Sequence, residues 1–360
     1  MIYLLILLLI LIIVGFYYIF TMMNKKKTQQ PNPNPNNPSY LATLKQHKDE
    51  GGHFPFRYLC DEKQKILPIV LISAFFRNDK EREMYKEYIE NGIAVVGITA
   101  YKSFPKPITD KTGDGDTKND PFNYLGEIQN WLCCFKEPEN YGFTEWHNLV
   151  NISESDFYDV DNSQKPEKKY DFIYVCLKDD DNTCPMDGWN AVNRNFKLAL
   201  ACFPIMIDEM GFKVLVIGRV NCGLEQLYGD KITVLDFLPY NGFQEKLRES
   251  RYLFVPNVYD ASPRVISEAI TKGVPVLLNR GIICGSKYIT EETGQLFSDE
   301  HDLRWAIEKL ISKTEQINPQ NWWANHYGKK QSGKILRDTL QNWYPNLIGN
   351  DVQEVYFTNG

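Results

Sequence analysis

The sequence predicts an α/β protein made of two doubly wound, Rossmann-like domains. Continuous apolar runs alternate along most of the chain with segments whose apolar residues recur at helical spacing. Apolar runs without polar alternation are typical of parallel strands that are buried on both faces of a sheet. The polar stretch DNSQKPEKKY at 161–170 interrupts this alternation. Because 360 residues are enough for two domains, we place them at 40–165 and 166–320.

Residues 1–23 predict a membrane-spanning helix. They contain no charged residue, and about 20 apolar residues are enough to span a bilayer core. Lys25, Lys26 and Lys27 follow directly, and the positive-inside rule places the chain after them in the cytoplasm. A cleaved signal peptide is the alternative, although such a peptide has a basic n-region and a shorter apolar stretch. We therefore expect a single-pass membrane protein whose domains face the cytoplasm.

Residues 24–39 predict a tether between this segment and the first domain. The stretch TQQPNPNPNNPS is rich in Pro, Asn and Gln, and such a composition cannot bury enough apolar surface to fold. The net charge of −6 leaves no basic footprint for a nucleic-acid partner. The eight cysteines are scattered without zinc-site spacing. We expect them to be buried, reduced thiols, as in a cytosolic domain.

The first domain is expected to contain three strands and two helices, followed by the polar boundary. The predicted strands are LPIVLISAFF (67–76), IAVVGITAY (93–101) and HNLVNI (147–152), and the predicted helices are KEREMYKEYIENG (80–92) and FNYLGEIQNWLCCF (122–135). Asn91-Gly92 is a suitable C-terminal stop for the helix that precedes it. These segments predict a strand–helix–strand unit.

The second domain shows a clearer alternation of the two kinds of segment. The predicted strands are 170–177, 213–218, 232–239, 252–257 and 274–279, and the predicted helices are 189–211, 241–251 and 263–272. This order predicts a mostly parallel, doubly wound sheet. Residues 321–360 form a C-terminal tail in which we expect amphipathic helix.

The stretch DASPRVISEAITKGVPVLLN (260–279) has the clearest chemical pattern. Ser262 is a suitable N-cap and Pro263 suits the first helical position, while Gly273 suits the end of the helix. The unpaired N–H groups at the helix start form an anion site at the edge where open α/β sheets bind ligands. Glu268 leans towards the same ligand, because Cβ bonds tilt towards the helix N-terminus.

Two carboxylates beside an anion site fit a ligand that carries both phosphate and hydroxyl groups. Asp260 lies in the loop before the predicted helix, and Glu268 lies within the helix. A carboxylate accepts strong hydrogen bonds from the vicinal hydroxyls of a ribose or a hexose. The pattern therefore predicts a nucleotide sugar as the ligand. The structural alternative is that both carboxylates belong to a solvated loop and helix face.

The stretch resembles the Glu-x7-Glu motif of retaining GT-B glycosyltransferases of the family-4, or group 1, type, with Asp260 in place of the first Glu. The order of the surrounding segments is also similar: KVLVIG, ITVLDFLPYNGFQEKLRESRYLFVPN, the acidic loop, and EAITKGVPVLLN. Downstream, ITEETGQLFSDEHDLRWAIEKL resembles the family's Thr-Gly-hydrophobic turn and following helix. The resemblance covers 211–310 and implies the GT-B architecture, in which two Rossmann-like domains face a cleft. The Asn-rich tether and compact first domain are also reminiscent of transferases from large DNA viruses.

The resemblance implies a role for each residue of the motif. Asp260 would contact the transferred sugar, and Glu268 the ribose of the nucleotide. Ser262, Pro263 and Arg264 would form the helix start that binds the donor phosphates. The loop that ends at Leu238 would hold the base largely through backbone groups. Members of the family need no metal or other cofactor, and they retain the anomeric configuration of the sugar.

The sequence departs from the family where an Arg and a Lys-Gly pair should bind the diphosphate. The region after the first strand of the second domain reads VCLKDDDNTCPMDGWN. Lys178 is the candidate for the Arg, with a solvated lysine as the alternative. Asp187-Gly188 stands where Lys-Gly is expected, so Gly188 is kept as a donor-binding residue. Arg194, one helical turn further, is the candidate substitute for the lysine.

The first domain also departs from the family, because it lacks the expected Gly-rich loop. The corresponding stretch, SAFFRND, offers Arg77 to the donor instead. His147 is the candidate for the histidine that some members direct at the sugar, with a structural histidine as the alternative. Asp114-Gly115-Asp116 matches the metal-binding motif of the GT-A fold, but no hydrophobic strand precedes it. We interpret this stretch as a solvated loop and predict no metal site.

These observations predict a membrane-anchored, metal-independent, retaining glycosyltransferase. It would transfer a sugar from a nucleoside-diphosphate sugar to a glycan or lipid-linked acceptor. Two alternatives keep the same fold. One is a catalytically silent scaffold that binds a sugar nucleotide or a glycan, which the Asp at position 187 favours. The other is a nucleotide-sugar epimerase. The sequence does not identify the sugar, the base or the acceptor.

Overall fold

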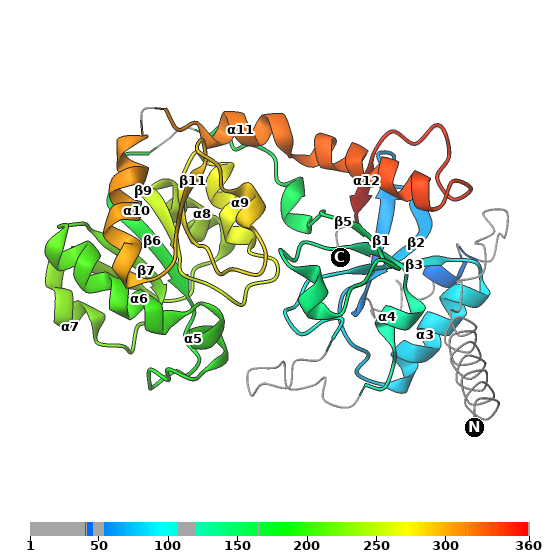
Figure 1. Cartoon of the computed structure of the whole chain (residues 1–360), viewed down its shortest axis with the longest axis horizontal. Coiled ribbons are helices and arrows are strands. Elements are labelled where there is room, and N and C mark those ends of the chain that lie inside the picture. Colours follow the sequence, from blue (N-terminus) through cyan, green and yellow to red (C-terminus); the bar gives the residue numbers. More distant parts are fainter. Residues whose placement is uncertain are drawn as a thin grey trace, which may run out of the picture.

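The computed structural model describes residues 40, 42–45, 54–106, 120–163, 166–314 and 316–358. The predicted membrane segment (1–23), the predicted tether (24–39) and the Asp114–Asp116 motif lie outside the described residues. Among the helices of the described ranges, none is both long and apolar enough to cross a membrane. The described chain forms two α/β units, each built on a six-stranded sheet (Figure 1).

The sheet of the first unit has the strand order β12-β1-β2-β3-β4-β5. Strands β2 to β5 are parallel and adjacent in chain order, whereas β1 is antiparallel to β2 and β12 is antiparallel to β1. The elements of this unit are β1 (Phe56–Asp61), β2 (Ile66–Ile72), α3 (Asp79–Glu90), β3 (Ala94–Ile98), α4 (Tyr124–Glu127), β4 (Asn130–Leu132), η1 (Pro138–Tyr141), β5 (Asn148–Val150) and η2 (Glu154–Phe157). The carboxyl ends of the four parallel strands therefore lie along one edge of the sheet.

The helix predicted at 122–135 is wrong. Residues Tyr124–Glu127 form the short helix α4, and the chain then turns into the strand β4. All three residues of β4 are buried, and the indole of Trp131 packs over Gly97 of β3, where a Cβ atom would overlap it. The burial of both faces explains why this apolar segment forms a strand in the middle of the sheet.

The sheet of the second unit is parallel throughout, with the order β11-β10-β9-β6-β7-β8. Its elements are β6 (Tyr170–Cys176), α5 (Trp189–Asn193), α6 (Phe196–Phe203), η3 (Pro204–Glu209), β7 (Val214–Gly218), α7 (Leu224–Tyr228), η4 (Gly229–Lys231), β8 (Ile232–Leu235), α8 (Tyr240–Arg248), β9 (Ser250–Val255), α9 (Arg264–Ile270), β10 (Val276–Asn279), η5 (Ser286–Tyr288), β11 (Gly294–Phe297) and α10 (Glu300–Ser312). The strand order reverses between β6 and β9, as in a doubly wound Rossmann sheet. The predicted α/β class is confirmed for both units.

The helix predicted at 189–211 is interrupted in the structure. Helix α5 ends at Asn193, and Asn195 adopts a left-handed backbone conformation with φ of 49° before α6 begins. Asn tolerates this region better than most residues, and its side-chain amide donates to the carbonyl of Pro256 at 3.0 Å. The interruption therefore ties the end of α5 to the loop that follows β9.

The C-terminal tail returns from the second unit to the first. Helices α11 (Pro319–His326) and α12 (Lys329–Trp343) run along the top of Figure 1, and they are followed by β12 (Val355–Phe357). The tail was expected to be helical, but it also contributes this edge strand, whose residues pair with Leu59 to Asp61 of β1. The tail is therefore part of the core of the first unit.

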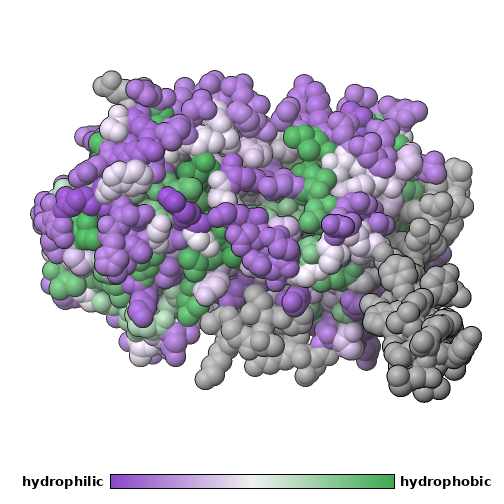
Figure 2. Space-filling model, in the orientation of Figure 1, coloured by the Kyte–Doolittle hydropathy of each residue, from purple (hydrophilic) through white to green (hydrophobic). Residues whose placement is uncertain are grey.

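The two units meet through segments that follow the carboxyl ends of their strands. Cys134, just after β4, donates through Sγ to the carbonyl of Ala261 at 3.0 Å. The amide of Lys136 donates to the carbonyl of Ile283 at 2.9 Å. The hydroxyl of Tyr288 donates to Asp156 at 2.5 Å. The carboxyl edges of the two sheets therefore face one another, and hydrophilic residues gather along the seam between the units in Figure 2.

Candidate functional site

The reversal of strand order between β6 and β9 locates the candidate site. In open α/β sheets the loops after the two strands that flank such a reversal diverge, and ligands bind in the resulting crevice. Here those loops are 177–188, after β6, and 256–263, after β9. The second loop contains the acidic residue of the sequence motif and leads into α9.

The start of α9 differs from the prediction. Ser262 was expected to be the N-cap and Pro263 the first helical residue, but the helix begins at Arg264 and Pro263 occupies the N-cap position. The backbone amide of Ser262 donates to Asp260 Oδ1 at 3.2 Å, and no side-chain cap bond is formed at Pro263. The turn at Asp260 therefore fixes the backbone of Ser262 just before the helix begins.

Asp260 and Arg194 are brought together by the structure. Arg194 Nη1 forms an ion pair with Asp260 Oδ2, and the side-chain amide of Asn257 donates to the same oxygen at 3.2 Å. Arg194 follows α5 directly, and its carbonyl accepts a hydrogen bond from the hydroxyl of Tyr174 at 2.9 Å. The pair places a guanidinium and a carboxylate side by side at the reversal of strand order.

Glu268 lies one to two turns into α9, in a different environment from Asp260. Its side chain is buried, with Tyr158, Gln244 and Lys272 around it. Burial raises the pKa of Glu268 above its usual range, against the opposing charges of Lys272 and Arg264. A buried carboxylate is costly unless it is hydrogen-bonded or paired, so this residue is suited to bind a ligand that donates hydroxyl hydrogens.

Lys178 is held by two carboxylates. Its Nζ lies 2.9 Å from Asp181 Oδ1 and 3.0 Å from Asp236 Oδ2. The hydrogen bonds that Lys178 donates to Asp181 and Asp236 raise the pKa of Lys178, so this side chain is a cation at neutral pH. Asp236 follows β8, as does the half-buried Leu238. Lys178 therefore joins the loop after β6 to the loop in which the nucleotide base was expected.

Gly188 has a structural reason to be glycine. A Cβ atom there would overlap the carboxylate of Asp179. That carboxylate accepts hydrogen bonds from the amides of Asn190 at 2.6 Å and Ala191 at 3.0 Å. Asp179 therefore caps the start of α5, and Gly188 gives it room to do so.

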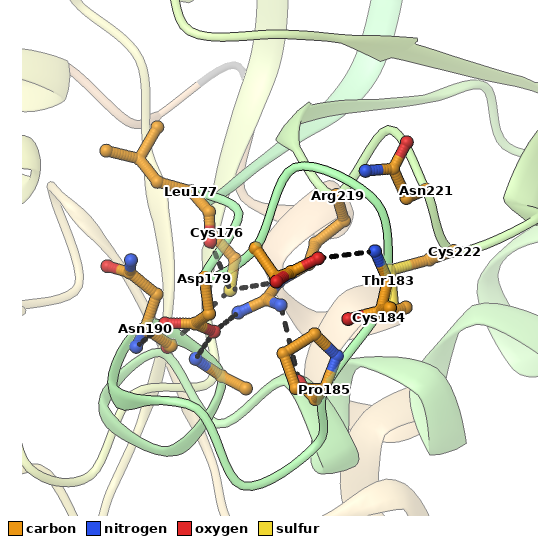
Figure 3. The surroundings of a disulfide bond; sticks show 12 residues. Cys176, Leu177, Asp179, Thr183, Cys184, Pro185, Asn190, Arg219, Asn221 and Cys222 are labelled. Carbon is orange, nitrogen blue, oxygen red and sulfur yellow. Dashed lines mark hydrogen bonds and ion pairs between the residues drawn. A yellow bond between two sulfur atoms is a disulfide. The ribbon is translucent and has the colours of Figure 1, made fainter.

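Arg219 is a buried cation that the sequence analysis did not single out (Figure 3). Its side chain is 1% exposed and pairs with Asp179 Oδ2 at 2.6 Å. Its Nε donates to Cys176 Sγ at 3.0 Å, and the guanidinium carbon lies 4.9 Å from the ring centroid of Phe196. Nothing in the sequence distinguishes this residue from a solvated arginine at a strand end. It fastens the loop after β6 to the end of β7.

A disulfide between Cys184 and Cys222 joins the same two loops. The prediction that the cysteines are reduced thiols is therefore wrong for this pair. The other cysteines of the described residues are free and buried, as expected: Cys60, Cys133, Cys134, Cys176, Cys202 and Cys284. The pair is 38 residues apart in the sequence, and such a spacing does not identify a disulfide without knowledge of the fold.

The two candidates of the first unit have only local partners within the described residues. Arg77 pairs with Glu81 at 2.7 Å, at the start of α3. His147 Nε2 lies 3.1 Å from the carbonyl of Leu125, and burial lowers the pKa of His147. The hydrogen bonds and ion pairs of both side chains stay inside the first unit, and the structure does not bring them to Asp260 or Glu268.

Two cavities adjoin α9, and Tyr158 lines both of them. The larger, of about 420 Å³, is lined by Arg57, Glu154, Phe157, Tyr158, Arg264, Lys329, Tyr356, Phe357 and Thr358. The smaller, of about 320 Å³, is lined by Tyr158, Asp159, Asp161, Tyr240, Asn241, Gln244, Arg248, Thr271 and Lys272. Sequence reasoning missed Arg57, because β1 was not predicted, and Tyr158, because it was placed in an irregular segment. In the described ranges no group of His, Cys, Asp and Glu side chains is arranged to hold a metal ion.

Comparison with known proteins identifies the fold. No family model and no curated protein matches the sequence. Among solved structures, the chain is similar to the GtfA/B complex (10% identity, TM-score 0.52, 73% of this chain and 55% of that one). It is also similar to sucrose-phosphate synthase from Thermosynechococcus elongatus (13% identity, TM-score 0.51, 85% of this chain and 77% of that one). A third similar structure is the lipopolysaccharide outer core galactosyltransferase WaaB (10% identity, TM-score 0.51, 76% of this chain and 75% of that one).

The likeness agrees with a GT-B fold, in which two Rossmann-like units are joined edge to edge. Identities of 10–13% establish the fold alone. This chain spans about half of the GtfA/B chain and about three quarters of the other two.

Proposed function

We propose that this protein is a glycosyltransferase that takes its sugar from a nucleoside-diphosphate sugar. The observation that carries the proposal is the arrangement around α9 at the reversal of strand order. Asp260 and Arg194 are paired at one end of the helix, and Glu268 is a buried carboxylate within it. A carboxylate for hydroxyls beside a cation for phosphate is the combination that a nucleotide sugar requires.

Each residue then has a task in binding the donor. Glu268 accepts hydrogen bonds from the ribose, in addition to those from Tyr158 and Gln244. Arg194 turns from Asp260 to the diphosphate, and the freed carboxylate of Asp260 accepts hydrogen bonds from the sugar. Lys178 adds a second cation from the loop that the disulfide and Arg219 hold in place.

The finer points of the proposal follow the resemblance seen in the sequence. The transfer is of the family-4 type, retains anomeric configuration and needs no metal, because Arg194 and Lys178 supply the positive charge. The acceptor is a glycan or lipid-linked sugar. Residues 1–23 anchor the protein in a membrane.

The experiment is a donor assay on the full chain in detergent, in the presence of EDTA. Binding and slow hydrolysis are measured across UDP-, GDP- and dTDP-sugars for the parent and for Glu268→Gln and Asp260→Asn. Loss of a charged hydrogen bond costs about 1.5–3 kcal/mol, so we expect donor affinity to fall at least about tenfold in Glu268→Gln. Glu83→Gln, on the exposed face of α3, is the matched control and should behave like the parent.

Two outcomes would contradict the proposal. If no nucleotide sugar binds, the carboxylates are structural and the fold serves another purpose. If activity depends entirely on manganese, metal independence is wrong even though transfer takes place. The anomeric configuration of the product tests retention separately.

A second candidate function is binding without turnover. Three cations near the site are paired with carboxylates in this structure: Arg194 with Asp260, Lys178 with Asp181 and Asp236, and Arg219 with Asp179. Asp187, which is exposed, stands where the family has a lysine. Gain of turnover in Asp187→Lys, from a parent that binds a nucleotide sugar without consuming it, would favour this candidate.

A further inference from the structure

The larger cavity beside α9 shares only Arg264 with the residues that the sequence analysis assigned to the donor. Four distant parts of the chain line it: β1 through Arg57, the segment 154–158 at η2, the start of α9 through Arg264, and the tail through Lys329 and residues 356–358. Asp260, Glu268, Arg194 and Lys178 are not among its lining residues. The cavity therefore forms only when the tail has returned to the first unit.

The charges around the cavity do not balance. Three of its lining side chains are cations and one, Glu154, is a carboxylate, and Glu154 forms an ion pair with Arg57. Within the described residues, no carboxylate lies within 4.0 Å of the side-chain nitrogens of Arg264 or Lys329, although the backbone amide of Lys329 donates to Asp159 Oδ1 at 2.8 Å. Burial, and after it the positive charge of Arg264, lowers the pKa of Arg57. Like charges held close together around an open volume favour an anion between them.

The walls of the cavity indicate what kind of anion fits. A planar guanidinium binds carboxylate and phosphate oxygens through paired hydrogen bonds, and two of the three cations are arginines. Phe157, Tyr158, Tyr356 and Phe357 supply the apolar part of the lining. Lys329 Nζ lies 4.9 Å from the ring centroid of Tyr356, so this cation stands over an aromatic face. A volume of about 420 Å³ holds one or two ring-sized groups.

We propose that this cavity binds an anionic sugar residue of the acceptor, namely one that carries a phosphate or a carboxylate group. The inference rests on the proposed function, which it deepens by naming the acceptor class. Arg264 connects the two sites, because its backbone begins α9 while its side chain lines the cavity. The anion of the acceptor would thus be fixed at one side of the helix that binds the donor.

The test uses the full chain with three probes: glucose 6-phosphate, glucuronic acid and glucose. Binding is measured by calorimetry for the parent and for Lys329→Gln and Arg264→Gln. We expect at least one charged probe to bind at least about tenfold more tightly than glucose, and each substitution to weaken it by about tenfold or more. Lys330→Gln is the matched control, because Lys330 is the exposed neighbour of Lys329 and does not line the cavity. Comparison of the two charged probes decides between phosphate and carboxylate.

Three results would overturn the inference. They are equal binding of glucose and the charged probes, an equal loss in Lys330→Gln and Lys329→Gln, and competition of UDP with the charged probe. The last would show that the cavity belongs to the donor diphosphate.

Nucleotide-sugar binding is measured on the same samples. If donors bind and charged sugars do not, only this inference fails. If charged sugars bind and no donor does, the proposed function fails while the anionic site stands.

Discussion

At the scale of single residues, the two carboxylates of the motif differ in what the protein does with them. Asp260 is paired with Arg194, whereas Glu268 is buried among polar groups with its pKa raised. Their sequence spacing identified both as candidates. It did not reveal Arg219 or Tyr158, because neither a lone arginine after a strand nor a tyrosine in a loop carries a spacing signal. Which charges are buried depends on the packing of distant loops.

Glu268→Gln should stabilise the protein while it weakens donor binding. A carboxyl group whose pKa is raised in the folded state holds its proton to higher pH than in the unfolded chain, so stability falls as pH rises through that interval. The cost is absent below the unfolded pKa and fully present above the folded one. We expect Glu268→Gln to unfold at higher denaturant concentration than the parent at pH 7 and to lose this advantage near pH 4. If the variant and the parent were equally stable at pH 7 as well as at pH 4, burial of the ionised carboxylate would carry no cost in stability.

Asp179→Ala should be among the more damaging single substitutions in the second unit. It leaves the guanidinium of Arg219, which is 1% exposed, without its counter-ion, and such a change costs about 3–5 kcal/mol. It also removes the cap of α5. The free energy of unfolding from chemical denaturation measures the effect. Asp181→Ala, at an exposed carboxylate that pairs with Lys178, should leave it unchanged. A similar loss in both variants would mean that the burial of Arg219 is not the cause.

At the scale of elements, continuous apolar runs predicted the central parallel strands, whereas edge strands and short strands carry no such signal. The strands of the second unit were all anticipated from continuous apolar runs up to β10. Strands β1 and β12 were missed, because an antiparallel edge pair has no extended apolar run and its partners lie at opposite ends of the chain. Strand β4 was interpreted as helix because its apolar residues also fit helical spacing, and only the sheet decides between the two.

Gly97→Ala tests the placement of β4 directly. A Cβ atom at Gly97 would overlap the indole of Trp131, which is fully buried, and overpacking of this kind costs about 1–3 kcal/mol. Gly242→Ala is the control, since Gly242 lies within α8 and a Cβ there meets nothing closer than 3.9 Å. That change should stabilise by about 0.5–1 kcal/mol. The midpoint of thermal unfolding should fall in Gly97→Ala and rise in Gly242→Ala. An unchanged midpoint in Gly97→Ala would argue against the placement of β4.

At the scale of the whole molecule, the sequence indicated two Rossmann-like units but not how they are completed. The first unit depends on the tail, because Leu336, Leu340 and Val355 are fully buried in the same cluster as Leu59 and Val96. The seam between the units depends on loops such as those of Cys134 and Ala261. Local patterns cannot predict such contacts, because they join segments that are more than a hundred residues apart. The sequence therefore predicted the part of the candidate site that lies in the second unit, but not the part that the first unit contributes.

A fragment of residues 54–163 should fail to fold by itself. It lacks the edge strand β12 and the helix α12, whose Leu336 and Leu340 are buried in the cluster around Leu59, so it would expose that cluster. The same fragment joined by a flexible linker to residues 329–358 supplies both elements and should fold. Cooperative urea unfolding followed by circular dichroism distinguishes the two. Cooperative unfolding of the short fragment would show that the tail is dispensable.

The bond between Cys184 and Cys222 also has a consequence for the biosynthesis of this chain. Disulfides persist where the surroundings are oxidising, as in the endoplasmic reticulum or the bacterial periplasm. In the cytosol, glutathione and thioredoxin keep cysteine thiols reduced. The lysine cluster at 25–27 favours the opposite side of a membrane. The disulfide indicates an oxidising compartment, whereas the lysine cluster predicts a cytoplasmic location. The oxidation state of this pair in cells, measured by alkylation with a mass tag, therefore tests whether the second unit folds in an oxidising compartment.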